Sequence, residues 1–269
     1  MTTDIAAPFK LRRGAAPLLI SMPHPGTIVP AELTARMADA ALRLPDTDWH
    51  LQRLYDFIGG LKASVIVATH SRYVIDLNRP ADDANLYPGQ DTTGLCPVDT
   101  FERQPIYRDG CGLDNGEIER RLQTFWKPYH AALRGELARL HQRHGIVVLW
   151  DAHSIRSVVP RLFEGRLPDL NLGTAGGAAC DGDLSDLLMH IARSDPHYSA
   201  VLDGRFKGGY ITRCYGRPAE GIHAIQLELA QRTYMQEDYP YSFDDHRAAM
   251  LRPVLERMLQ AALRWATRR

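Results

Sequence analysis

This sequence lacks an excess of charge of one sign, paired cysteines and long apolar runs. Lysine and arginine together number 32, as do aspartate and glutamate, so the formal net charge is zero and a general affinity for nucleic acid is not expected. The four cysteines include no CxxC pair, which excludes a cysteine-rich metal site and favours a reduced, cytoplasmic protein. No run approaches the roughly 18 apolar residues of a membrane span, so we expect no membrane partner either.

Two familiar catalytic signatures are missing as well. The glycine-rich stretch at 163–180 lacks both GxGxxG and the lysine of a P-loop, so it does not indicate a nucleotide site. The segment DAHSIRS at 151–157 does not match the nucleophile elbow GxSxG, so Ser154 is not expected to act as a nucleophile.

Short apolar runs alternate with longer helical patterns along the chain. This alternation predicts an α/β fold in which helices flank a mixed, mostly parallel sheet. No internal repeat or linker is visible, so we expect one domain over residues 1–269. The run at 146–150 is apolar throughout, as in a central strand covered on both faces. The predicted strands are residues 17–22, 64–69, 73–77, 146–150 and 222–229.

The clearest helical pattern covers residues 115–144, where apolar side chains recur at helical spacing. Asp114 begins a motif that resembles a capping box, and Pro128 is expected to kink the helix. Two long polar segments, 79–113 and 154–182, are predicted to be functional loops. The other predicted helices are residues 31–42, 47–61, 183–194 and 245–267.

Polar side chains stand at or near the ends of three predicted strands. His24 and His153 each follow an apolar strand, and Glu228 lies inside one. Because ligands bind outside the carboxyl ends of strands in open α/β sheets, we expect the two histidines to converge. Two imidazoles and a carboxylate around an open fourth position make a catalytic zinc site.

The segment PDTDWH, residues 45–50, offers three candidates for the third ligand. Asp46, Asp48 and His50 compete for this role. Asp46 or Thr47 could simply cap the helix that follows. Asp48 is favoured as the ligand, because in the first helical turn its carboxylate would remain free.

Glu228 is unusual because an acid inside an apolar strand is costly unless it is paired or catalytic. One interpretation is a structural salt bridge to an arginine. The other is a general base whose pKa is raised by burial and which activates a metal-bound water.

Several arginines lie in two motifs, SRYVIDLNRP and GGYITRCYGRP. The first contains Arg72 and the pair Asn78 and Arg79, and the second contains Arg213 and Arg217. Guanidinium groups bind carboxylates with two parallel hydrogen bonds, so arginines beside a metal indicate a small anionic substrate. The alternative is that these are surface arginines in ordinary ion pairs.

Taken together, the longer motifs resemble the N-formylglutamate amidohydrolase family. They span about residues 20–235 and read PHPGT, LPDTDWHLQRLYDF, SRYVIDLNRP, LWDAHSIRSVVPRLFEGRLPDLNLGT, GRFKGGYITRCYG and HAIQLELAQRTYM. The resemblance implies a fold like that of zinc-dependent exopeptidases and a distant likeness to aspartoacylase. It implies hydrolysis of N-formyl-L-glutamate to formate and L-glutamate, a step of histidine degradation.

The resemblance also implies roles for single residues. Glu228 would be the general base, and Arg72 would polarise the scissile carbonyl. Asn78 and Arg79, with Arg213, would hold the substrate carboxylates. Two other functions fit the same residues: removal of a different acyl group from an acidic amino acid, and binding of acidic small molecules without catalysis.

The metal ligands implied by the resemblance are His24 and His153. The exopeptidase relatives use His-x-x-Glu, but Thr27 stands three residues after His24 here. The carboxylate ligand must therefore come from elsewhere, and we expect Asp48. Zinc suits this set, although another divalent transition metal would also fit.

Overall fold

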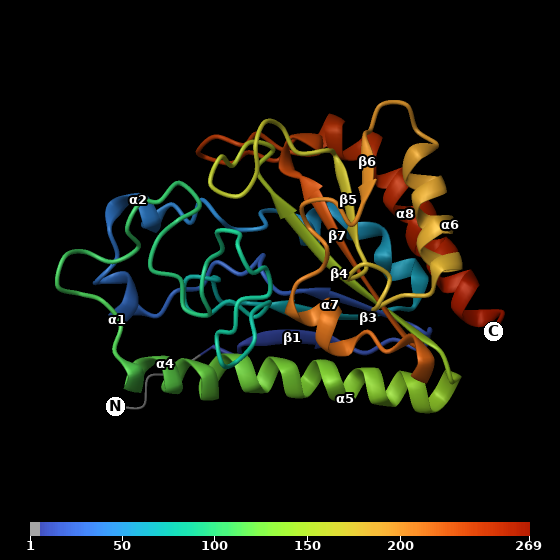
Figure 1. The fold of residues 1–269 in the computed structure, drawn as a ribbon, viewed down its shortest axis with the longest axis horizontal. Helices are drawn as coiled ribbons and strands as arrows, with labels where there is room; N and C mark the ends of the chain where they lie inside the picture. The colour runs from blue at the N-terminus through green and yellow to red at the C-terminus, as the bar shows by residue number, and fades with distance from the viewer. Residues whose placement is uncertain (1–5) are drawn as a thin grey trace.

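A seven-stranded sheet lies between two layers of helices in the computed structural model, which describes residues 6–269 (Figure 1). The strand order is β1-β3-β2-β4-β7-β5-β6, and β3, β2, β4 and β7 run parallel to one another. Strand β1 is antiparallel to β3, and β5 is antiparallel to β7 but parallel to β6. The predicted mixed, mostly parallel sheet is confirmed. The strands are β1 (Phe9–Arg12), β2 (Leu18–Met22), β3 (Ser64–Ala68), β4 (Val147–Ile155), β5 (Leu170–Gly173), β6 (Ala200–Leu202) and β7 (Ile222–Ala230).

The helices divide between the two faces of the sheet. Figure 1 shows α5 along one side of the strands and α6 with α8 along the other. None of the described helices is long and apolar enough to cross a membrane. The α-helices are α1 (Ala31–Thr34), α2 (Asp39–Leu42), α3 (Leu51–Leu54), α4 (Asn115–Arg121), α5 (Lys127–His144), α6 (Gly182–Arg193), α7 (Tyr210–Tyr215) and α8 (Asp245–Thr267). The shorter helical turns are η1 (Asp56–Leu61), η2 (Leu122–Trp126), η3 (Pro218–Glu220) and η4 (Gln231–Thr233).

Strand β4 lies in the middle of the sheet, and all nine of its residues are buried. Successive side chains of a strand point to opposite faces. Trp150 packs in the core with α6 and α8, whereas Leu149 packs with residues of α5. By this alternation Asp151 and His153 point to the same face as Leu149, the α5 side. On that face the side chains of β4 change from apolar to polar at the carboxyl end of the strand.

The predicted strands are confirmed in four of five cases. The strand predicted at 73–77 is wrong: this segment makes turns, and Asp76 N donates to Leu95 O instead of joining the sheet. The apolar side chains of this segment are nevertheless buried. A buried segment that does not pair with a strand has the same apolar sequence pattern as one that does. Strands β1, β5 and β6 have only three or four residues each and were not predicted; β5 lies inside the segment 154–182 that was predicted as a loop.

Helices α6 and α8 match their predictions to within one residue at each end. The predicted helix 115–144 is divided, because the π-helical turn η2 separates α4 from α5 just before Pro128, a residue that lacks the N–H of a regular helix. Asp114 caps α4 as expected, accepting from Glu117 N at 2.6 Å. The segments 31–42 and 47–61 form only short helices and turns.

Candidate metal centre and active site

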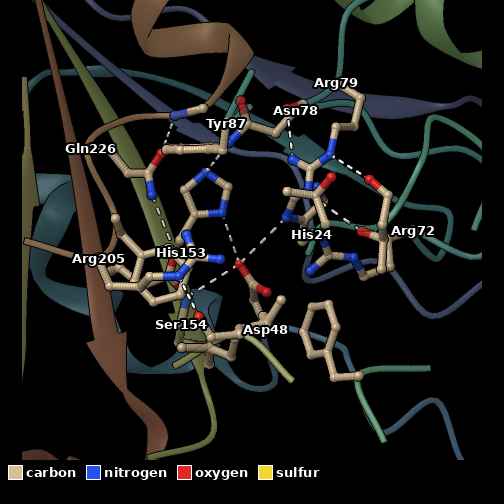
Figure 2. A pocket seen from close by; sticks show the side chains of 18 residues that line it. His24, Asp48, Arg72, Asn78, Arg79, Tyr87, His153, Ser154, Arg205 and Gln226 are labelled. Atoms are coloured by element: carbon tan, nitrogen blue, oxygen red, sulfur yellow. Dashed lines mark hydrogen bonds and ion pairs between the residues drawn. The ribbon is translucent and has the colours of Figure 1, made fainter. Parts of the chain in front are cut away.

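His24, Asp48 and His153 lie together at the carboxyl ends of β2 and β4, and each is at most 3% exposed. Asp48 Oδ2 lies 3.2 Å from His153 Nδ1 and 3.9 Å from His24 Nδ1. Figure 2 shows the Asp48 carboxylate between the two imidazoles. Ligand atoms in a tetrahedral zinc site, each about 2.1 Å from the ion, are about 3.4 Å apart. The donor set therefore fits a metal of this kind in chemistry, and its ligand atoms all lie within 4.8 Å of one another.

The loop that carries His24 is held close to the segment after β3. Ile28 N donates to Thr69 O at 3.1 Å. A Cβ atom on Gly26 would stand only 2.3 Å from His70 O, so the close approach of the two backbones requires glycine at this position. The sequence PHPG thus fixes the imidazole just beyond the end of β2.

The three candidates for the carboxylate position are separated by their surroundings. Asp46 accepts from Phe101 N at 2.9 Å and from Tyr73 OH at 2.8 Å, and it is not part of the group that could hold a metal. His50 Nε2 bonds to Tyr241 O at 2.7 Å. Only Asp48 joins the cluster of three, as expected.

The local structure around Asp48 differs from the prediction. Helix α3 begins at Leu51 with His50 as its N-cap, so Asp48 lies in the turn before the helix and not in its first turn. No side chain caps this helix. Asp48 N donates to His24 O at 3.1 Å, and Ser154 N donates to Asp48 Oδ2 at 3.2 Å. Backbone bonds therefore tie the carboxylate to both histidine-bearing segments.

A second carboxylate faces the far nitrogen of each imidazole. Asp76 Oδ1 lies 2.7 Å from His24 Nε2, and Asp151 Oδ2 lies 3.0 Å from His153 Nε2. Metal-binding histidines typically donate their other ring N–H in this way. Both Nδ1 atoms are thereby left facing Asp48.

The same environment shifts the two histidines in opposite directions. Burial lowers the pKa of His24, and the nearby Arg72 guanidinium lowers it further. Burial opposes the charged form of His153 too, but the carboxylates of Asp151 and Asp48 prevail and hold the pKa of His153 well above its usual value. The carboxylates around the two histidines therefore stabilise one positive charge at this centre, as expected of a site that binds a cation.

Glu228 lies beside this centre on the neighbouring strand. It pairs in register with His153 and is 7% exposed. Gln226 Nε2 donates to Glu228 Oε2 at 3.2 Å. Within residues 6–269 no arginine or lysine forms an ion pair with Glu228, so the salt-bridge interpretation is not supported. Burial raises the pKa of Glu228 to about 8, which suits a group that takes up and returns a proton near neutral pH.

Arg72 reaches the same pocket from the loop after β3. Its Nη2 donates to Asp76 Oδ2 at 2.6 Å, and its guanidinium carbon lies 4.8 Å from the centre of the Phe101 ring. Among the described residues, its Nε has no hydrogen-bond partner although it is buried. An unpartnered donor at the wall of a pocket is suited to meet an oxygen of a bound molecule.

Arg79 and Arg205 line the pocket without a counter-ion from residues 6–269. Arg79 donates to Thr93 O at 2.8 Å, and Arg205 donates to the carbonyl of Leu162. Burial lowers the pKa of Arg205, and repulsion from Arg79 lowers it further. An anionic ligand would relieve this repulsion. Figure 2 shows both arginines among the residues that line the pocket.

Two of the predicted arginines lie outside the pocket. Arg213 is exposed on α7, where its guanidinium lies 5.1 Å from the centre of the Tyr87 ring. Arg217 pairs with Glu220 at 3.3 Å near the start of β7, whereas Glu228 lies near the other end of that strand. The structure therefore gives no support to these two as substrate ligands.

Asn78 lies at the pocket wall, and its Oδ1 is already engaged by the protein. Its Oδ1 accepts from Ile211 N at 2.8 Å, and its Nδ2 lies 3.1 Å from His153 Nε2. A Cβ on Gly209 would stand 2.3 Å from Asn78 Nδ2, so the amide fits only against glycine. The geometry favours a role for Asn78 in fixing the pocket more than in holding substrate.

Four polar residues of the site were not predicted from the sequence. Asp151 and Gln226 each precede a predicted residue by two positions on the same strand, and this spacing places them on the same face, so alternation was an available signal. Asp76 and Arg205 come from irregular connections, where no periodic signal exists.

Comparison with known proteins identifies relatives over nearly the whole chain. The sequence profile of the N-formylglutamate amidohydrolase family matches residues 16–235. The N-formylglutamate deformylase of Pseudomonas putida is 51% identical over 257 residues, which are 96% of each chain. The enzyme of the same name from Pseudomonas aeruginosa is 50% identical over 258 residues, covering 96% of this chain and 97% of that one.

A solved structure agrees with the sequence comparison. The crystal structure of N-formylglutamate amidohydrolase from Ralstonia eutropha JMP134 superposes with a TM-score of 0.81 at 28% identity and covers 97% of both chains.

Proposed function

This chain belongs to the N-formylglutamate amidohydrolase family, and on that premise we propose that it hydrolyses N-formyl-L-glutamate to formate and L-glutamate. One observation of the structure carries the proposal. A buried acid, a three-ligand centre and two guanidinium groups that have no counter-ion among the described residues line the same pocket. This combination suits hydrolysis of an amide that carries two carboxylates.

The two arginines account for the substrate class. N-Formylglutamate has an α-carboxylate and a γ-carboxylate, and Arg79 and Arg205 offer one cationic group to each. Hydrogen bonds to charged groups each contribute about 1.5–3 kcal/mol, which is enough to discriminate against substrates with one carboxylate.

The centre of His24, Asp48 and His153 would hold a divalent metal, and zinc suits two imidazoles with one carboxylate. Such an ion supplies Lewis acidity, which makes water more acidic and the amide carbonyl more electrophilic.

The chain's own residues supply the proton transfers and the charge stabilisation. Glu228 takes the proton of the attacking water and later delivers it to the amine that leaves as glutamate. Arg72 directs a guanidinium at the oxygen of the scissile carbonyl, where negative charge develops. Gln226 holds Glu228 in position by the hydrogen bond of 3.2 Å.

The cysteines bear on the compartment in which the protein works. All four cysteines are free thiols, which is usual in reducing compartments, and we infer that the protein acts in the cytoplasm on a free amino-acid derivative.

Release of the free amino acid from N-formyl-L-glutamate tests the proposal, with N-acetyl-L-glutamate and N-formyl-L-aspartate as alternative substrates followed in the same way. We expect the highest kcat/KM for N-formyl-L-glutamate. Preference for the acetyl compound would assign the enzyme to another N-acyl substrate. Saturable binding of all three without turnover at any metal loading would make the protein a binder and contradict the proposal.

A further inference from the structure

Asp76 contacts two groups of the proposed machinery while remaining outside the pocket itself. It is fully buried, and both of its carboxylate oxygens are engaged. Oδ1 lies 2.7 Å from His24 Nε2 and accepts from Asn78 N at 2.8 Å. Oδ2 accepts from Arg72 Nη2 at 2.6 Å.

We propose that Asp76 is a positioning residue that fixes the metal-facing imidazole of His24 and the guanidinium of Arg72 at the same time. This inference rests on the proposed function. Through one carboxylate, Asp76 links the affinity for the metal to the stabilisation of charge on the substrate. The residue itself touches neither metal nor substrate.

The second imidazole provides an internal comparison. Asp151 holds His153 as Asp76 holds His24, with 3.0 Å between Asp151 Oδ2 and His153 Nε2. Its other oxygen accepts from Ser21 Oγ at 2.9 Å and not from an arginine. Asp151 therefore serves the metal centre alone, whereas Asp76 serves both the centre and Arg72.

The chemistry of the carboxylate explains why an amide cannot replace it. Oδ1 and Oδ2 of Asp76 both accept hydrogen bonds, and Asn offers only one acceptor oxygen. If the amide oxygen of Asp76→Asn faces His24, the amide N–H groups face the donor Nη2 of Arg72. In the opposite orientation the amide donates toward Nε2 of His24 and favours the tautomer with its proton on Nδ1, the nitrogen needed by the metal.

The test compares Asp76→Asn with the matched variant Asp151→Asn in two measurements. Zinc affinity, measured by competition with a chelating dye, should fall about 10–100-fold in both variants. At saturating zinc, kcat should fall about tenfold for Asp151→Asn, which disturbs the metal centre alone. It should fall about 100-fold for Asp76→Asn, because the guanidinium that faces the carbonyl is no longer held.

A double-mutant cycle with Arg72→Ala isolates the link through Arg72. At saturating zinc, adding Asp76→Asn to Arg72→Ala should lower kcat no more than Asp151→Asn does alone, since the guanidinium is already gone and only the hold on His24 is lost. A further 100-fold loss in that background would show that Asp76 does not act through Arg72. Equal kcat values for Asp76→Asn and Asp151→Asn would also overturn the proposal.

Imidazole ¹⁵N spectra of the zinc-loaded wild-type protein provide a readout that needs no folded variant. We expect His24 to carry its proton on Nε2, beside Asp76, and a proton on Nδ1 of His24 would contradict the assignment. The proposed function fails separately, if wild-type protein shows no zinc-dependent formate release. The positioning role fails if wild-type protein is active and the variants behave alike.

Discussion

The residues proposed for the reaction and those proposed for substrate recognition occupy different kinds of structure. His153 and Glu228 lie in neighbouring central strands, paired in register, and His24 follows the end of a third strand. Arg79 and Arg205 come from connections between elements and reach the pocket with carbonyl groups as their protein partners. The two histidines and Glu228 are fixed by the sheet, whereas the two arginines depend on the path of loops.

This difference indicates which properties should be hard to change and which should be adjustable. Strand residues are held within a fully buried ladder, so the relation of Glu228 to His153 follows from the fold itself. Loop residues can move or be replaced without disturbing that ladder. Loss of a strand residue should therefore affect kcat, and loss of Arg79 or Arg205 should affect KM.

The largest effect is expected at Glu228. Glu228→Gln keeps the size of the side chain but cannot accept a proton, so kcat should fall about 10²–10⁴-fold while the metal content stays unchanged. Formate release and elemental analysis measure the two quantities. Glu220 is exposed, so Glu220→Gln is the matched control and should have wild-type kinetics. Unchanged kcat in Glu228→Gln would remove this residue as the general base.

A smaller effect is expected at the loop arginines. Arg79→Ala and Arg205→Ala should each raise KM for N-formyl-L-glutamate about 10–100-fold, with kcat much less affected, because each loses one charged hydrogen-bonding group for a carboxylate. Arg217→Ala serves as the control, since Arg217 lies outside the pocket. A fall in kcat alone would contradict a role in holding carboxylates.

The loop that carries Arg79 is anchored by a buried histidine whose titration should affect stability. His130 Nε2 bonds to Leu77 O at 2.9 Å, and burial lowers the pKa of His130 from 6.5 to about 3. The folded protein thus resists protonation that the unfolded chain accepts. The contribution of His130 is fully present above pH 6.5 and is lost as the pH falls toward 3.

Chemical denaturation between pH 7 and pH 5 measures this effect. At pH 5 the wild-type protein should have lost about 2 kcal/mol of unfolding free energy through His130. His130→Asn should show a shallower decline over the same range. Identical pH dependence in the two proteins would show that His130 does not contribute.

The smallest effect is expected at a position remote from both sets of residues. Asp114→Ala removes the N-cap of α4 and should lower the unfolding free energy by about 1 kcal/mol without changing kcat or KM. Thermal unfolding and formate release measure the two outcomes. A kinetic change in this variant would mean that the division between strand and loop residues does not describe the enzyme.

The sequence indicates the strand-borne half of the site much better than the loop-borne half. His24, His153 and Glu228 each interrupt a periodic apolar pattern, and such an interruption is visible without coordinates. Asp48 was preferred over two neighbours and does join the cluster, although it precedes the helix that was expected to hold it. Local pattern was therefore sufficient wherever regular structure fixed the side chain.

The arginines show where such reasoning fails. Arg79, Arg205, Arg213 and Arg217 each lie within three residues of a glycine or proline, and their sequence environments do not distinguish them. Their positions depend on how the segments 79–113 and 203–209 fold back on the sheet, which is a tertiary property. The strand wrongly predicted at 73–77 has the same cause, because its apolar residues are buried by packing and not by strand pairing.

The central claim is that His24, Asp48 and His153 hold a metal ion that the reaction requires. The most direct test measures formate release from N-formyl-L-glutamate with protein as purified, after chelation, and after zinc is restored, with metal content followed by elemental analysis. We predict that activity disappears with the metal and returns with it. Full activity in protein shown to be free of metal would contradict the account.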